Sequence, residues 1–353
     1  MKRTLALLMA LAMMLAMTAG LAESASSINV GTLSFLNMPE DRYFEMGQLY
    51  QSGMTYLFDQ GIIVPSPEAV ENMDRMSDMF EVFASDDTKM VYYDNLDSLV
   101  MALQKGDILS AFLPLTTVKY LCAQNDEFIH IMDVSDVEPD AFARLLLARN
   151  SYGYSFMLME DHAELRDQIN AAIGEMKQDG TLDALTQKYI YDAIDGAEPE
   201  AVAFEQTDGE TIKVAVTGSL PPMDYVAPDG TFAGFNTALL AELGKRIEKN
   251  FELVQVDSLG RAAALASGTA DMVFWTRGWS YPLSQMGFEE SPKSLDELAD
   301  WLNLTEEQVE MGHSMFPDSV NLLDAFNGDI PEGTIITTPY FTDYTLMVMR
   351  KAD

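Results

Sequence analysis

Apolar and polar positions follow the same order in two separate stretches of the chain. The first stretch predicts strand, long helix, strand, short helix and strand at 28–32, 40–61, 90–93, 96–105 and 108–113. The second stretch predicts the same order: a strand at 212–216, a helix that carries Leu239 to Ile247, a strand at 251–256, a short helix at 259–267 and a strand at 272–275. A βαβαβ order implies a mostly parallel sheet flanked by helices, with ligands beyond the carboxyl ends of the strands.

The two stretches can be aligned residue by residue. Residues 101–113 match 263–275 without a gap, and Ala, Leu, Gly and Phe coincide, with Gly106 opposite Gly268. In both copies a short helix would pack an Ala-Leu face on a sheet, stop at a glycine in the left-handed conformation, and lead into a buried strand. We therefore predict an α/β fold of two similar lobes, each a mostly parallel sheet flanked by helices.

One segment interrupts this periodicity. Residues 196–210 are acidic and contain Pro and Gly, so we predict a linker between one half at 28–195 and another at 211–353. Within the second half, 278–333 carries the capping-box patterns Ser294-Leu-Asp-Glu297 and Thr305-Glu-Glu-Gln308. These predict a helical insertion.

The first 22 residues predict a signal peptide. Lys2 and Arg3 precede a 13-residue apolar run, Leu5 to Met17, and small residues follow up to Ala22. That run is too short for a membrane-spanning helix, although an uncleaved anchor is the alternative. No cysteine follows directly after it, so we expect an exported protein without a lipid anchor, periplasmic or extracellular.

Charge narrows the possible partners. The chain has 21 basic and 56 acidic residues, which gives a net charge of −35. Because such a surface repels phosphate groups, it excludes nucleic acid as a partner and disfavours binding to anionic membranes. The single cysteine, Cys122, excludes an intrachain disulfide framework, and the three histidines lack metal-ligand spacing. We expect no cofactor and no metal.

Several motifs in order carry a resemblance to a known family. They are Pro221-Pro222-Met223-Asp224-Tyr225, Asp229-Gly230, Gly234-Phe235-Asn236, residues 264–271 (Ala-Leu-Ala-Ser-Gly-Thr-Ala-Asp) and Thr338-Pro339-Tyr340-Phe341-Thr342-Asp343. Residues 212–275 resemble the first lobe of the extracellular solute-binding proteins of polar amino-acid ABC importers. Glu164–Asn170 and Lys177–Leu182 resemble the closing helices of that family's second lobe.

The resemblance implies a two-lobed periplasmic-binding-protein-like fold of type II. It also implies a monomeric receptor that closes about a hinge, here expected near Gly31 and Met347, around a small polar solute such as an amino acid. ABC permease subunits would be its membrane partners. The second-lobe half comes first in this chain, which indicates circular permutation; a truncated tandem array is the alternative. Two other functions are possible on the same scaffold: catalysis, or a ligand-free sensory or interaction module.

Candidate ligand-binding residues follow from this resemblance and from strand ends. Arg277, directly after the predicted strand, is our candidate for a carboxylate clamp, with Thr276 and Asp224 near it. An apolar wall would come from Met223, Tyr225 and Trp275, for which plain core packing is the alternative. Hydroxyl groups of Thr32, Ser34 and Thr116 would face the cleft from the second lobe, with helix capping as the other use of Thr116.

The chain departs from the family at three acidic positions. The family's G-F-D-x-D reads Gly234-Phe235-Asn236-Thr237-Ala238 here, without either acid, and the ammonium-binding Asp of the second lobe is replaced by Pro114. These departures argue against the usual mode of α-amino-acid binding.

Overall fold

The structure, a computed structural model, describes residues 28–36, 53, 55–71, 88–149, 151–197, 201–278, 294–315 and 330–351. The predicted signal peptide lies outside these residues. Of the helix predicted over 40–61, residues 53 and 55–59 are described as helical. Among the described residues, no helix has the length and apolarity needed to cross a bilayer.

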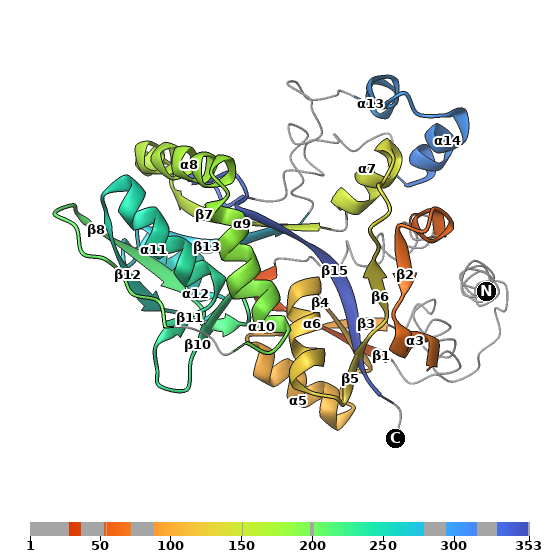
Figure 1. Cartoon of the computed structure of the whole chain (residues 1–353), viewed down its shortest axis with the longest axis horizontal. Helices are drawn as coiled ribbons and strands as arrows, with labels where there is room; N and C mark the ends of the chain where they lie inside the picture. The colour runs from red at the N-terminus through yellow and green to blue at the C-terminus, as the bar shows by residue number, and fades with distance from the viewer. Residues whose placement is uncertain are drawn as a thin grey trace.

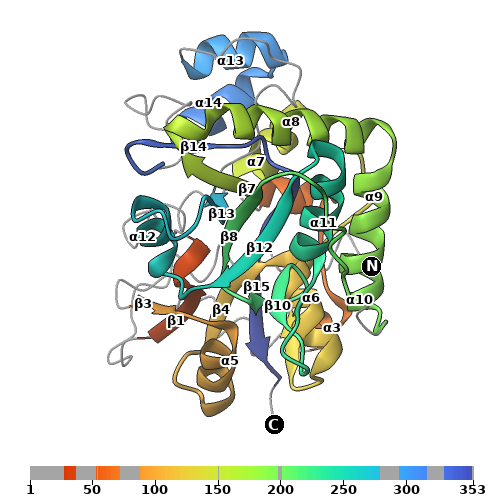
Figure 2. The same cartoon turned by 90° about the vertical axis from the view of Figure 1, so that its left-hand side faces the viewer.

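Three parallel strands form the first lobe, in the order β12 (Asn250–Gln255), β8 (Thr211–Val216) and β13 (Met272–Gly278). The antiparallel strand β7 (Ser151–Met159) pairs with β13 along its whole length, and β14 (Thr334–Ile336) pairs with β7. Successive side chains on these strands enter two separate apolar clusters: Val214 and Met272 join one, Ala215 and Val273 the other. Both faces are therefore covered, and Figure 2 shows α11 (Phe235–Ile247) and α12 (Gly260–Ala266) on opposite sides of the strands.

The second lobe repeats this plan. Its parallel strands are β3 (Thr88–Tyr93), β1 (Ile28–Leu33) and β4 (Ser110–Pro114). The end of β15 (Phe341–Arg350) pairs antiparallel with β4 and with β5 (Phe128–His130). The described helices are α3 (Pro67–Glu71), α5 (Leu96–Lys105), α6 (Leu115–Gln124), α7 (Ala141–Arg149), α8 (Ala163–Gln178), α9 (Thr181–Thr186), α10 (Asp192–Ile194), α11 (Phe235–Ile247), α12 (Gly260–Ala266), α13 (Leu295–Leu302) and α14 (Glu306–Met315).

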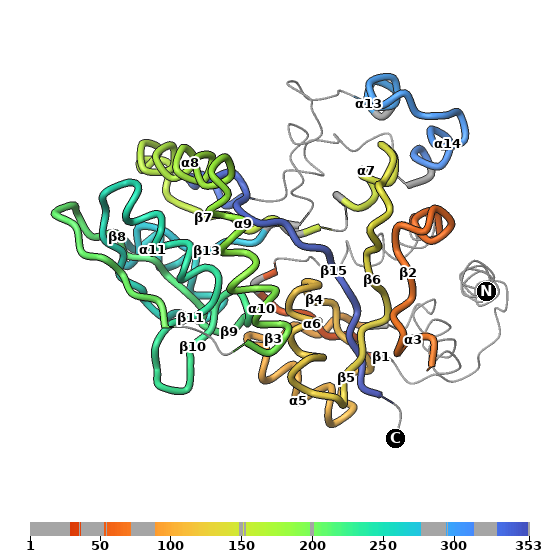
Figure 3. The backbone as a smooth tube through the Cα atoms, viewed as in Figure 1, coloured from red at the N-terminus to blue at the C-terminus, as the bar shows by residue number. Residues whose placement is uncertain are grey.

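One strand belongs to both lobes. In β15 (Phe341–Arg350), residues 341–344 pair with β7 and residues 345–349 pair with β4. Figures 1 and 3 show it running through the middle of the molecule, between the two sets of strands. The chain crosses back between the end of α7 and the start of β7, and Ser151 at that point pairs with Tyr344. Both crossings thus lie side by side.

This arrangement corrects the expected hinge and divides the chain differently from its sequence halves. Gly31 lies inside β1, which pairs only with β3 and β4 of the second lobe, so the hinge expected there is wrong. Residues 151–186 pack with the strands of 211–278, while the end of β15 joins the second lobe. Each lobe is therefore built from both halves of the sequence.

The internal repeat is confirmed in its details. Gly106 and Gly268 both follow their short helix with positive φ, 77° and 69°. Each copy also ties the loop before its last strand to the first strand: Leu109 N donates to Asn29 O at 3.0 Å, and Asp271 N donates to Lys213 O at 2.9 Å. The same turn chemistry therefore sets the same strand order twice.

Three smaller parts complete the described chain. Strands β9 (Ser219–Leu220), β10 (Asp224–Val226) and β11 (Phe232–Ala233) form a small antiparallel sheet on the first lobe. Strands β2 (Ile63–Pro65) and β6 (Met132–Val134) pair into an antiparallel ribbon beside the second lobe, which we call the side ribbon. Residues 201–207 of the predicted linker form neither helix nor strand.

The side-chain N-caps predicted for both helices of the insertion form. Ser294 Oγ accepts from Glu297 N at 3.1 Å at the start of α13. At α14 the exchange is reciprocal, because Gln308 N donates to Thr305 Oγ1 at 3.2 Å and Thr305 N donates to Gln308 Oε1 at 2.9 Å. The insertion is helical where the structure describes it.

Candidate functional site

The carboxyl ends of the parallel strands of both lobes meet, and we call this place the lobe junction. After β12, Ser258 Oγ donates to the carbonyl oxygen of Asp94, which follows β3 of the other lobe, at 2.8 Å. The single turn Ser34–Leu36 after β1 contacts β13. Ligands of open α/β sheets bind at such strand ends, so the junction is the candidate site.

Asp224 supplies a buried carboxyl group on the first-lobe side. Its Oδ2 accepts hydrogen bonds from Thr217 N, Thr217 Oγ1 and Gly218 N at 3.2, 3.2 and 3.0 Å. Its Oδ1 is buried and has no hydrogen-bond partner among the described residues. Burial raises the pKa of Asp224, against the hydrogen bonds from Thr217 and Gly218 and the positive charge of Arg261.

Arg261 is a buried cation that sequence reasoning missed. Its side chain lies over the Trp275 ring, with the guanidinium carbon 4.8 Å from the ring centroid. Nε donates to Ser258 O at 3.1 Å and Nη1 to Phe274 O at 3.2 Å. Burial lowers the pKa of Arg261 to about 10, so it remains charged at neutral pH. The available signal was its position as the only charged residue between Asp257 and Asp271.

The strand that carries our first candidate is longer than predicted. β13 runs to Gly278, so Arg277 is within the strand and its backbone pairs with Gly153, while its side chain lies outside the described set. Trp275 and Thr276 precede it and are buried. The structure therefore brings these two residues and the backbone of Arg277 to the junction, and the clamp remains a prediction.

Met223 and Tyr225 lie on either side of Asp224. Met223 is fully buried in the main core, which agrees with the core-packing alternative. Tyr225 is half-buried in β10, and burial raises its pKa to about 12. Of this pair, only Tyr225 keeps part of its surface exposed.

On the second-lobe side, two candidate hydroxyl groups are bonded within the protein. Thr32 is buried and donates to Phe112 O at 3.1 Å. Ser34 donates to Tyr93 O at 3.2 Å and lies 3.4 Å from Asp94 Oδ1. They fasten the ends of β1, β3 and β4 to one another at the junction.

Thr116 lies at the start of α6, where helix capping was the alternative to a role in the cleft. Its N and Oγ1 both donate to Asp343 Oδ2, at 2.9 and 2.6 Å, so Asp343 of β15 caps the start of α6. The other oxygen of Asp343 accepts from Tyr344 N at 2.8 Å. Burial outweighs these bonds and raises the pKa of Asp343 to about 6.

Family-like motifs from distant parts of the chain contact one another behind the junction. Tyr340 Oη donates to Asn236 Oδ1 at 3.0 Å, and both residues are buried. Asn170 Oδ1 accepts from Thr338 N at 2.8 Å, and Lys177 Nζ donates to Pro339 O at 3.1 Å. The residue that replaces a family acid, Asn236, therefore anchors the segment leading into β15.

Within the described residues, no three His, Cys, Asp or Glu side chains gather in a way that could hold a metal ion.

Comparison with known proteins agrees with the resemblance for one segment. Residues 212–277 match the family of bacterial extracellular solute-binding proteins, family 3, which confirms the resemblance inferred for 212–275. That family consists of binding proteins. No curated protein matches the chain.

Solved structures give distant matches. NikA from Staphylococcus aureus, in complex with Ni(L-His)2, has a TM-score of 0.34 and 10% identity over 75% of this chain and 57% of its own. DppA from Helicobacter pylori, in complex with the peptide STSA, has a TM-score of 0.34 and 12% identity over 74% of this chain and 52% of its own. A phosphate-binding protein from Streptococcus pneumoniae has a TM-score of 0.30 and 11% identity over 74% of this chain and 75% of its own. The chain spans little more than half of the first two, and similarity at this level leaves its ligand open.

Proposed function

We propose that the protein is an extracytoplasmic solute receptor, which captures a small polar solute at the lobe junction and presents it to the permease of an ABC importer. The observation that carries this is the meeting of the carboxyl ends of both parallel sheets at one place. The two adjacent chain crossings support hinge closure about the Ser151–Tyr344 pair. The family match over 212–277 supports the same class of protein.

The solute we propose is an amino acid or a related compound. Arg277 would clamp its carboxylate with a guanidinium fork, and Trp275, Thr276 and Tyr225 would border it. In this proposal the protein acts as a monomer in the periplasm or outside the cell, after removal of residues 1–22. It performs no catalysis.

We propose further that the chain is circularly permuted relative to the family. In support, β1, β3 and β4 from its first half pair with β15 from its end, while β7 pairs with β13. A truncated tandem array is the other account.

A melting-temperature screen against amino acids, short peptides and amines tests the receptor function. A solute present at 100 times its dissociation constant stabilises the folded state by about 2.7 kcal/mol. We expect one class of polar solute to raise the melting temperature. If no solute does so, the ligand-free module becomes the better account.

Substitution of Arg277 tests the clamp separately. Removing one partner of a buried ion pair costs about 2–5 kcal/mol, or roughly 30- to 5,000-fold in affinity. We expect Arg277→Ala to abolish calorimetric binding with little change in melting temperature, and Arg277→Lys to restore part of it. Arg144→Ala is the control, because Arg144 is half-exposed on α7 and pairs with Glu138. Affinity within twofold of wild type in Arg277→Ala would refute the clamp and favour a cationic or aromatic solute beside Tyr225 and Trp275.

A further inference from the structure

Asp343 connects the two lobes through its side chain. Its backbone pairs with Tyr152 of β7, in the first lobe. Its Oδ2 accepts hydrogen bonds from Thr116 N and Thr116 Oγ1, at 2.9 and 2.6 Å. Thr116 lies in the first turn of α6, which directly follows β4 of the second lobe and packs on β4 and β5. The carboxyl group of a first-lobe position therefore holds the start of a second-lobe helix.

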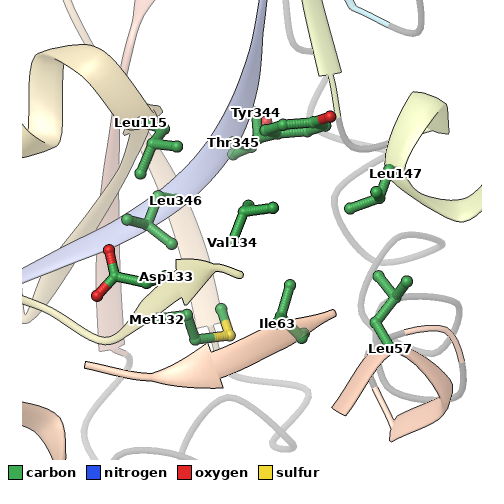
Figure 4. Close-up of a pocket in the computed structure, with 10 residues that line it drawn as sticks. All are labelled: Leu57, Ile63, Leu115, Met132, Asp133, Val134, Leu147, Tyr344, Thr345 and Leu346. Atoms are coloured by element: carbon green, nitrogen blue, oxygen red, sulfur yellow. The ribbon is translucent and has the colours of Figure 1, made fainter. Parts of the chain in front are cut away.

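These hydrogen bonds cross the point where β15 changes lobe. Tyr344 pairs with β7, and Thr345 pairs with Pro114, the last residue of β4 before α6. Figure 4 shows Tyr344 and Thr345 on β15, with Leu115, the first residue of α6, close to the same strand. Because Asp343 precedes the change of lobe and α6 belongs to the far side of it, turning one lobe against the other moves donor and acceptor relative to each other. The hydrogen bonds therefore favour one angle between the lobes.

The surroundings of Asp343 make its negative charge costly to bury. Asp343 is 3% exposed, and burial raises its pKa to about 6, against its hydrogen bonds and the positive charge of Lys119 on α6. Lys119 also pairs with Asp133 at 2.9 Å, to which His130 of β5 is bonded as well. Tyr191, directly before α10, is a second titratable neighbour, and burial and then the charge of Asp343 raise its pKa. The adjoining strands β7 and β4 contain no Asp, Glu, Lys, Arg or His.

We propose that Asp343 is a positioning residue of the hinge, whose side chain holds the lobes at the angle that brings their strand ends into contact. We call this the closed angle. Asp343 acts on the angle between the lobes and does not touch the solute. Its role rests on the receptor function only in that the lobes rotate about the Ser151–Tyr344 pair.

The protonation of Asp343 then sets how firmly the lobes are held. In the protonated form, Oδ2 can donate to Thr116 Oγ1 while it accepts from Thr116 N, and no charge is buried. In the ionised form, the carboxylate gains more from water than from its hydrogen bonds, because burial has raised its pKa from 3.8 to about 6. The closed angle is therefore favoured most at pH values below 3.8, and this preference is lost as pH rises through 6.

Electron–electron double resonance between two spin labels measures this angle in the full chain. Met101→Cys on α5 and Ala263→Cys on α12 place the labels at exposed positions, on helices that begin beside the Ser258–Asp94 contact. Cys122→Ala removes the native thiol. We expect a shorter distance to dominate at pH 5 and a longer one to grow toward pH 7.5, with the ratio of the two changing about tenfold over this range. A distribution that does not change with pH overturns the proposal.

Two variants and a control separate positioning from a merely structural role. Asp343→Asn has the shape of the protonated form, so it should keep the shorter distance at both pH values. Asp343→Ala removes the hydrogen bonds with Thr116, so it should show the longer distance at both. Asp140→Asn is the matched control, because Asp140 Oδ1 caps α7 by accepting from Ala143 N at 2.7 Å, a bond between neighbours in the sequence, and it should titrate as wild type does.

If Asp343→Ala fails to fold, Asp343→Asn carries the test, and a wild-type pH response in folded Asp343→Asn overturns the proposal. The receptor function fails separately. A solute that raises the melting temperature, together with a distance that is independent of pH, overturns the role of Asp343 and leaves the receptor function in place. A pH-dependent distance without any binding solute does the reverse.

Discussion

Gln308 connects the helical insertion to the second-lobe side of the molecule, and its removal should loosen the insertion. Its Nε2 donates to Tyr56 Oη at 2.8 Å and to Asp140 Oδ2 at 3.2 Å. Tyr56 Oη in turn donates to Asp140 Oδ2 at 2.7 Å. Asp140 Oδ1 accepts from Ala143 N at 2.7 Å at the start of α7, so the carboxylate serves a helix cap and this contact together.

The strength of the contact follows from its geometry and exposure. Burial, then the Asp140 hydrogen bond, raises the pKa of Tyr56 to about 12, so its hydroxyl keeps its proton and donates throughout the neutral range. A neutral hydrogen bond contributes about 0.5–1.5 kcal/mol net, and one to a charged group about 1.5–3. Because this contact is partly exposed, we expect Gln308→Ala and Tyr56→Phe each to cost roughly 1–1.5 kcal/mol.

Gln308 also completes the capping box of α14, so a control must separate the two roles. Thr305→Ala removes the hydroxyl that accepts from Gln308 N but leaves the contact with Tyr56 and Asp140 in place. Urea denaturation should give a coupling energy of about 0.5–1.5 kcal/mol between Gln308→Ala and Tyr56→Phe, and none between Thr305→Ala and Tyr56→Phe. Hydrogen exchange should accelerate across residues 295–315. Additive effects of the first pair would refute the connection.

Two further predictions concern pH and backbone conformation. The pKa of Asp343, raised from 3.8 to about 6 by burial, means that the folded state holds a proton that the unfolded state has lost between those values. The free energy of unfolding should therefore fall by up to about 3 kcal/mol from this group as pH rises from 4 to 7. Asp343→Asn should flatten that fall in urea denaturation, and an unchanged pH profile would refute it. Gly106→Ala and Gly268→Ala should each lower the free energy of unfolding by roughly 1–2 kcal/mol, because φ is positive at both positions. An added Cβ meets nothing within 4 Å at either position, so a steric clash adds nothing to this cost. Gly174→Ala, at an equally open position inside α8, should instead stabilise by roughly 0.5–1 kcal/mol, and the same sign at all three would contradict this.

Local patterns predicted local structure well. The helix predicted over 96–105 forms at those residues, with Asn95 Oδ1 capping its start and Gly106 its end. Strand positions differ from prediction by one or two residues at most ends, and β13 by three. Periodicity, caps and glycine turns depend on neighbours in the sequence, which is why they could be read directly.

Long-range pairing could not be read in this way. Thr116 and Asp343 are 227 positions apart, and neither has a local signal for the other. Arg261 sits in a short Ala-rich helix that looks like any helix surface, and only the packing of α12 against β13 places it over Trp275. The candidate site could therefore be placed at strand ends, but not the side chains that fill it.

The pairing of Ser151 with Tyr344 has a mechanical consequence. Two crossings of the chain between the lobes pass through neighbouring positions of a single ladder in the described residues, so these two crossings form one pivot. Rotation about that pivot changes a few backbone torsions and leaves each sheet intact. Sliding one lobe along the other would shear the hydrogen bonds of β15 with β7 or β4. At these two crossings, the pairing of β15 therefore favours rotation of one lobe against the other over translation.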